Sequence, residues 1–139
     1  MTKKIIIFFI VAVFAFFIAG FVEAALEGVV KYVIPGVFIF VLLEEAVKVL
    51  PIKFFKLFRA EMKIYLIITA AVFSALEFAL SPEWALPDLL TFGGIIRLIP
   101  HPVFASTFYL AGRRSLLWGY LAASAVHMAW NYIAIFVFN

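Results

Sequence analysis

The chain has 139 residues, of which 68% are hydrophobic and 14% are charged, and it contains no cysteine. A soluble domain is about half apolar and about a quarter charged, so this composition excludes an ordinary soluble domain and predicts an integral membrane protein. The net charge of +3 is small, and the lack of thiols excludes disulfides and thiolate chemistry.

Five apolar segments are long enough to cross a bilayer as helices, which takes about 20 residues each. They cover about residues 5–22, 32–50, 64–80, 86–112 and 116–138. The expected fold class is therefore all-α, a single polytopic transmembrane helix bundle over residues 1–139. For the first segment a cleaved signal peptide is the alternative, because Val22-Glu23-Ala24 resembles a cleavage site; the apolar run is longer than the usual ~7–15 residues of a signal.

The basic residues predict an orientation. They concentrate before the first segment, between the second and third, and between the fourth and fifth, at Lys3, Lys4, Lys53, Lys56, Arg59, Lys63, Arg113 and Arg114. By the positive-inside rule these parts face the cytoplasm, so a multi-pass cell-membrane protein with its N-terminus inside and its C-terminus outside is expected. Basic residues alternate with Phe and Leu after Pro51, which is typical of an amphipathic segment on the bilayer surface. This stretch is too short to predict nucleic-acid binding.

Glu44-Glu45-Ala46-Val47-Lys48 lies inside the second apolar segment, where a charge costs about 2.5–3.5 kcal/mol on insertion scales. On a helix, Glu44 and Lys48 are one turn apart and can pair. Glu45 points about 100° away and is expected to stay outside that pair. The Glu44–Lys48 pair could have a structural role and hold packed helices together, or the two acids could belong to a functional site.

Three further segments carry polar residues of their own, namely Glu77, then Arg97 and His101, then His127 and Asn131. At ~1.5 Å rise per residue, Glu44, Glu77, His101 and His127 all lie about 17–20 Å from one end of their segments, near the middle of a hydrocarbon layer about 30 Å thick. We therefore expect these side chains to face one another or a wet cavity.

The alternatives for these residues are structural. His127 and Asn131 share a helix face and could form hydrogen bonds that hold neighbouring helices together. Arg97 is expected to be a counter-ion for a glutamate. His101 stands between Pro100 and Pro102, which predicts a kinked or unwound helix at His101. Irregular backbone at membrane depth occurs where it is buried in protein or lines a cavity, which favours a site here.

The chemistry that fits these residues is activation of water. A carboxylate near a histidine can deprotonate a water molecule, and His127 with Asn131 can supply donors to a developing oxyanion. Glu77, His101 and His127 could instead hold Zn²⁺ or another divalent metal. The residue types are compatible with either a metal-dependent or a metal-free mechanism.

In order, the motifs are Glu44-Glu45-x-x-Lys48, Phe73-x-x-x-Glu77, Arg97-x-x-x-His101 and His127-x-x-x-Asn131. This series resembles the PrsW-like branch of the intramembrane protease superfamily that includes CAAX prenyl endopeptidases and bacteriocin-processing CPBP proteins. The resemblance covers four of the five segments and implies hydrolysis of peptide bonds at the membrane. Prenyl endopeptidases have His at the end of the second motif; Glu77 stands there in this chain, which argues against prenyl-protein processing.

The leading hypothesis is an intramembrane endopeptidase acting on a membrane protein or peptide. Glu44 would activate the water, with Glu45 as its acidic partner; Glu77 and His101 would position the water or a metal; His127 and Asn131 would stabilise the oxyanion. Lys48, Phe73 and Arg97 would support them. The alternatives are a small proton- or ion-coupled transporter and a catalytically silent scaffold or immunity-type protein. The sequence specifies no oligomeric state.

Overall fold

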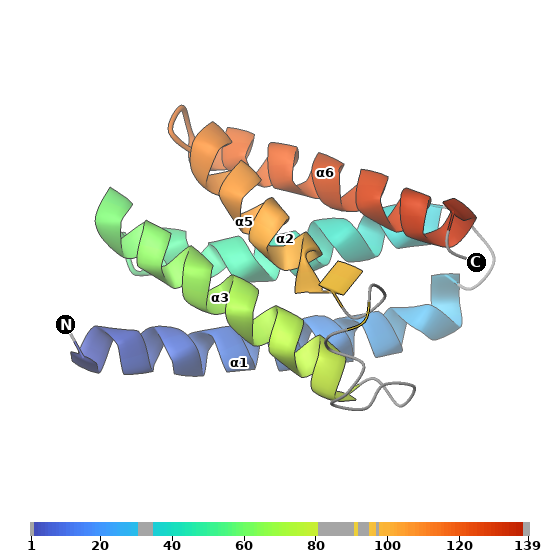
Figure 1. The fold of residues 1–139 in the computed structure, drawn as a ribbon, viewed down its shortest axis with the longest axis horizontal. Coiled ribbons are helices and arrows are strands. Elements are labelled where there is room, and N and C mark those ends of the chain that lie inside the picture. The colour runs from blue at the N-terminus through green and yellow to red at the C-terminus, as the bar shows by residue number, and fades with distance from the viewer. Residues whose placement is uncertain (1, 31–34, 81–90, 92–94, 97, 138–139) are drawn as a thin grey trace.

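The computed structural model describes residues 2–30, 35–80, 91, 95–96 and 98–137. These residues form the helices α1 (Thr2–Val30), α2 (Pro35–Phe54), α3 (Arg59–Leu80), α5 (Pro100–Ala111) and α6 (Leu116–Val137). Successive helices run in alternating directions, so α1 begins at one end of the bundle and α6 ends at the other (Figure 1). The all-helical prediction is confirmed for the described part of the chain.

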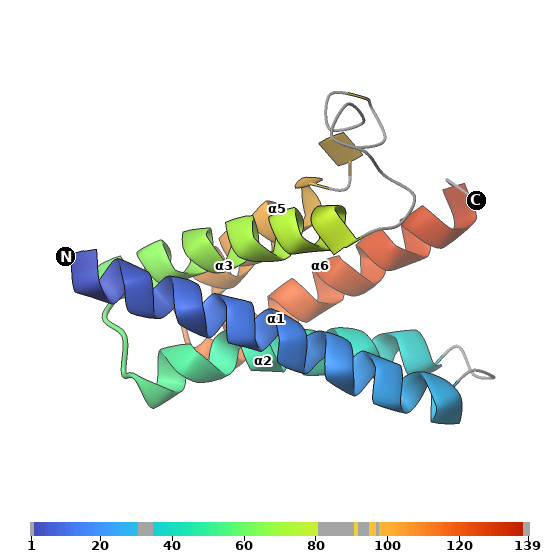
Figure 2. The ribbon, with the colours of Figure 1, turned by 90° about the horizontal axis from the view of Figure 1, so that it is seen from below.

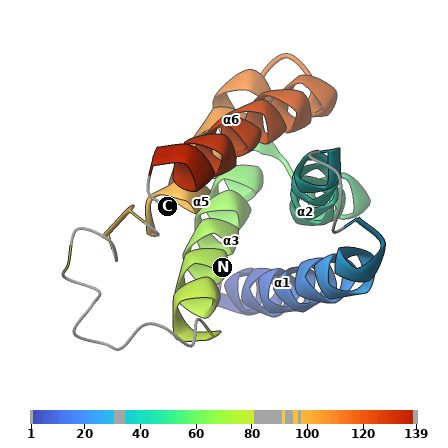
Figure 3. The same ribbon diagram turned by 90° about the vertical axis from the view of Figure 1, so that its right-hand side faces the viewer.

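The helices pack in a closed ring, seen along the bundle in Figure 3. α1 packs against α2 and α3, α5 packs against α3 and α6, and α6 packs against α2. α1 and α2 lie close together where α1 ends and α2 begins, and they separate toward the other end of the bundle (Figure 2). The ring brings the middle of α2 opposite the first turns of α5 and the middle of α6, which places the predicted motifs on facing helices.

The helix boundaries differ from the predicted segments. α1 continues to Val30, beyond the predicted end of the first segment near residue 22, because Glu and Ala are good helix formers and a helix need not end where the bilayer ends. α2 continues past Pro51 to Phe54, since a proline near the end of a helix removes a single backbone hydrogen bond. The predicted fourth segment lies partly outside the described residues, and its described helix, α5, has 12 residues.

The connection between α2 and α3 is fixed at both sides. Leu57 N–H donates to Ile52 O over 3.0 Å, and Lys56 N–H donates to Lys53 O over 3.3 Å, with Lys56 at φ 49°. This is the Schellman arrangement that ends a helix with one left-handed residue. α3 then begins with a capping interaction, in which Phe58 N–H donates to Glu61 Oε2 over 3.3 Å. The connection is therefore a short ordered turn.

Large apolar side chains cover much of the exterior. In α1, residues such as Ile6, Phe9, Phe14, Phe17 and Phe21 are about half or more exposed, whereas Phe8, Ala12 and Ala15 are buried. Among the described residues two helices are long and apolar enough to cross a membrane, α1 through Thr2–Ala25 and α3 through Arg59–Leu80. The chain thus has helices of membrane-spanning length and an apolar outer surface.

Candidate functional site

Four helices bring their polar side chains to one place inside the bundle. α2 supplies Glu44, Glu45 and Lys48; α3 supplies Glu77; α5 supplies His101; and α6 supplies His127. Each of these side chains lies within 4.0 Å of at least one other member of the group. The predicted convergence of Glu44, Glu77, His101 and His127 is therefore confirmed. We call these six residues the polar cluster.

Lys48 lies at the centre of the polar cluster and is buried. Its Nζ is 2.5 Å from Glu44 Oε1, 2.8 Å from Glu45 Oε1 and 3.3 Å from His101 Nδ1. An ammonium has three N–H donors, and these three acceptors use all of them. The prediction that Glu45 stays outside the Glu–Lys pair is wrong, because Lys48 is also within one turn of Glu45 at a spacing of three residues and reaches both carboxylates.

His101 links Lys48 to Glu77. Its Nδ1 faces the Lys48 ammonium, and its Nε2 is 2.7 Å from Glu77 Oε2. Because the ammonium can only donate, we assign the lone pair of a neutral His101 to Nδ1 and the proton to Nε2, which donates to Glu77. The hydrogen bonds then run in one direction, from Lys48 through His101 to Glu77.

The predicted break in the fourth segment lies before His101 rather than at it. Ile99 is a bend, and α5 begins at Pro100, so Pro100 and His101 are both in the first helical turn. A proline there costs little, because the first amides of a helix have no partner within it. The two prolines thus help to start the helix that carries His101, and His101 itself is helical.

His127 contacts both glutamates of the first motif. Its Nδ1 is 3.0 Å from Glu45 Oε1, and its Nε2 is 3.9 Å from Glu44 Oε2. Glu45 accepts, so we assign the proton of a neutral His127 to Nδ1, which leaves a lone pair on Nε2 facing Glu44. The gap between His127 Nε2 and Glu44 Oε2 is too long for a hydrogen bond and is of the kind that a water molecule bridges.

Two phenylalanines form the apolar walls of the polar cluster. Lys48 Nζ lies 4.6 Å from the ring centroid of Phe73, and the same ring meets His101 edge-on at 5.5 Å. Phe104 stacks on His127 with centroids 4.1 Å apart and 17° between the planes, and it meets His101 edge-on at 5.9 Å. Both rings are buried, so they restrict how Lys48 and the two imidazoles can move.

The polar cluster is open on one side. The side chains of Glu45, Lys48, His101 and His127 are buried, whereas the Glu44 side chain is 25% exposed and that of Glu77 is 55% exposed. Glu44 and Glu77 are therefore the two acids of the polar cluster that are accessible from outside, and the buried residues hold Glu44 and Glu77 in place.

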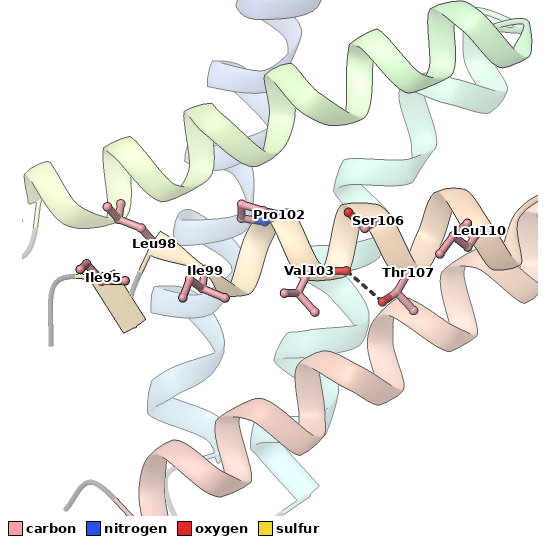
Figure 4. Close-up of a pocket in the computed structure, with 8 residues that line it drawn as sticks. All are labelled: Ile95, Leu98, Ile99, Pro102, Val103, Ser106, Thr107 and Leu110. Carbon is pink, nitrogen blue, oxygen red and sulfur yellow. Dashed lines mark hydrogen bonds between the residues drawn. The ribbon is translucent and has the colours of Figure 1, made fainter. Parts of the chain in front are cut away.

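An apolar hollow of about 420 Å³ lies on the outward face of α5. Its walls include Leu98, which precedes α5, and Pro102, Val103, Ser106 and Thr107 of α5; Figure 4 shows these residues between α3 and α6. Leu98 is held to α3, because Ser74 Oγ donates to its carbonyl oxygen over 3.1 Å. Pro102, Val103 and Ser106 are exposed, whereas His101 and Phe104 are buried, so the hollow lies on a different face of α5 from the one that carries His101.

The residues that best fit a metal are not the predicted trio. Glu44, Glu45 and His127 each offer an atom within 4.8 Å of the others, whereas both ring nitrogens of His101 face other partners, Lys48 and Glu77. The Lys48 ammonium already lies between the two carboxylates of this trio. The ammonium would repel a divalent cation there, so these residues fit a metal poorly.

Two further predicted residues are Arg97 and Asn131. Arg97 lies outside the described residues. Asn131 is one turn beyond His127 on α6 and is partly exposed, so it flanks the polar cluster. Phe104 was not predicted from the sequence, although its position three residues after His101 places both on one face of a helix. Tyr65, whose hydroxyl donates to Lys48 O over 3.1 Å, was not predicted either.

No family model matches the chain, and neither a curated protein nor a solved structure matches it.

Proposed function

We propose that the chain is an intramembrane endopeptidase that hydrolyses a peptide bond of a membrane-associated protein by a metal-free, glutamate-activated mechanism. The observation that carries the proposal is the pair formed by Glu44 Oε2 and His127 Nε2, two acceptors 3.9 Å apart. A water bridging them would donate one hydrogen to each and present its oxygen lone pairs outward. Glu44 is partly exposed, so a scissile carbonyl could approach that water.

In the proposed reaction Glu44 takes a proton from the water as the water oxygen bonds to the carbonyl carbon. Asn131 is the donor that we place at the developing oxyanion. The C–N bond then breaks, and the leaving amine takes the proton from Glu44. Glu45 holds the Nδ1 proton of His127, which keeps the lone pair of Nε2 directed at the water. Lys48 holds both carboxylates in position through its contacts of 2.5 and 2.8 Å.

The proposal includes five membrane spans, with the N-terminus in the cytoplasm and the C-terminus outside. The apolar exterior and the two helices of spanning length support a membrane location. α1 begins at one end of the bundle and α6 ends at the other (Figure 1), as an odd number of spans requires. We also propose that α1 is retained, because Phe16 of α1 packs edge-on against Phe73 with centroids 5.2 Å apart. The motif series, which resembles PrsW-like proteases, supports the same function.

A proton-coupled transporter is the second candidate. The observation that favours it is the connected path from Lys48 through His101 to Glu77, whose side chain is 55% exposed. Such chains of ionisable side chains occur in proton relays. A transporter would need this path more than the pair formed by Glu44 and His127.

One preparation separates the two candidates. The purified protein is reconstituted into liposomes with a pool of extracted membrane proteins, and both new peptide termini and proton flux are measured for the wild type, Glu44→Gln and Lys63→Gln. Lys63 is an exposed cation of α3 and serves as the control. The peptidase predicts new termini with the wild type and Lys63→Gln and none with Glu44→Gln. Proton flux without new termini would favour the transporter.

A further inference from the structure

The turn between α2 and α3 lies at one end of the bundle (Figure 2), and it carries both exposed aromatic rings and exposed cations. Phe54 and Phe58 are 81% and 79% exposed, and Phe55 between them is also exposed. Lys53, Lys56 and Arg59 alternate with these rings and are exposed as well. We call these six residues the turn surface.

The turn surface is held in shape by the backbone. The Schellman arrangement ends α2 at its base, and the Glu61 carboxylate caps the start of α3. Phe54 and Phe55 also meet edge-on, with centroids 5.2 Å apart. The three rings are therefore displayed on an ordered turn, where burying each one from water would gain about 1.5–3 kcal/mol.

The three cations of the turn surface have no carboxylate partner among the described residues. The neighbouring acid, Glu61, is paired with Lys4 of α1 and accepts from Phe58 N–H. The turn surface thus keeps its full positive charge beside its exposed rings. An exposed apolar patch of this kind marks a binding surface, and the alternating charge indicates what is bound.

We propose that the turn surface is a docking site for anionic lipid. The Phe rings enter the boundary between headgroups and acyl chains, and Lys53, Lys56 and Arg59 bind headgroup phosphates. A basic segment with interleaved aromatic rings gains from both apolar burial and attraction to an anionic leaflet. The start of α1 and the turn between α5 and α6 lie toward the same end (Figure 1), so this end of the bundle faces the anionic leaflet as a whole. The proposal stands independently of peptide hydrolysis.

The binding test uses native mass spectrometry of the purified protein with an equimolar mixture of phosphatidylglycerol and phosphatidylcholine. We expect the wild type to retain phosphatidylglycerol preferentially. Replacing the three cations by Gln should lower that preference about fivefold per charge, which corresponds to about 1 kcal/mol for each Lys or Arg near an anionic surface. A matched variant, Lys53→Arg with Lys56→Arg, keeps the charge and should keep the preference. Equal retention of phosphatidylglycerol by the wild type and the triple Gln variant would overturn the proposal.

A second measurement tests the Phe rings and does not depend on lipid retention in the gas phase. The chain has no cysteine, so Phe54→Cys gives a single site for an environment-sensitive dye, at a position too exposed to disturb folding. In nanodiscs containing one fifth phosphatidylglycerol, the dye emission should shift to the blue relative to nanodiscs of phosphatidylcholine alone, and 0.5 M salt should reverse the shift by screening. A dye that reports water in both nanodiscs would overturn the proposal, as would a wild type that prefers a short oligonucleotide to phosphatidylglycerol vesicles.

Discussion

Replacing Lys48 by Met removes the ammonium that contacts Glu44, Glu45 and His101, while keeping a side chain of similar length. The loss of the ammonium destabilises the Glu45 carboxylate most, because its side chain is buried, whereas the Glu44 side chain is 25% exposed and is partly screened by solvent. Removing one partner of a buried ion pair costs about 3–5 kcal/mol. Because the ion pair of Lys48 with the more exposed Glu44 contributes little stability, we expect Lys48→Met to lower the free energy of unfolding by about 3 kcal/mol.

The assay is unfolding in mixed micelles, followed by tryptophan fluorescence, for Lys48→Met, Glu45→Gln and the double variant. Removing the charge of Glu45 as well relieves the uncompensated carboxylate, so the double variant should lose about 1–3 kcal/mol less than the sum of the single variants. Lys63→Met, on an exposed position of α3, is the control and should change stability by less than about 0.5 kcal/mol. Additive losses, or a loss from Lys48→Met no larger than that of the control, would refute the central place of Lys48.

The remaining predictions concern single positions. Phe104→Leu keeps apolar volume but removes the ring stacked on His127, so kcat should fall by about 10- to 100-fold with little change in KM; a normal kcat would show that the stacking does not orient the imidazole. A divalent-metal chelator should leave cleavage intact, and lost activity restored by Zn²⁺ would contradict the metal-free mechanism. Lys56 has a left-handed backbone conformation, with φ 49°, which glycine adopts without a steric cost. Lys56→Gly should therefore raise the free energy of unfolding by about 1 kcal/mol.

Hydropathy and polar spacing predicted much of this structure. The apolar segments predicted the all-helical class, because a run of about 20 apolar residues is the length that crosses a bilayer as a helix. The equal depths of Glu44, Glu77, His101 and His127 predicted their convergence, since charges buried in separate helices are tolerated when they meet. These predictions depend on the sequence of each segment and need no knowledge of the packing angles.

What the sequence did not predict depends on side-chain reach and on neighbouring helices. Lys48 contacts both glutamates because a long side chain spans the angle that separates them on the helical wheel, and the position of His101 on α5 gives it a third acceptor. Phe104 looked like any apolar residue, and its stacking on His127 depends on how α5 packs against α6. The start of α5 before His101 was missed because two prolines indicate a break but do not say on which side of them a helix resumes.

The most direct measurement compares peptide termini in membranes of cells that express the wild type, Glu44→Gln or Lys63→Gln at matched levels. If Glu44 activates the hydrolytic water, termini should appear with the wild type and Lys63→Gln and be absent with Glu44→Gln, provided that the variant retains its helical content. The same new termini in cells with folded Glu44→Gln would contradict the proposed role of Glu44 and, with it, the proposed mechanism.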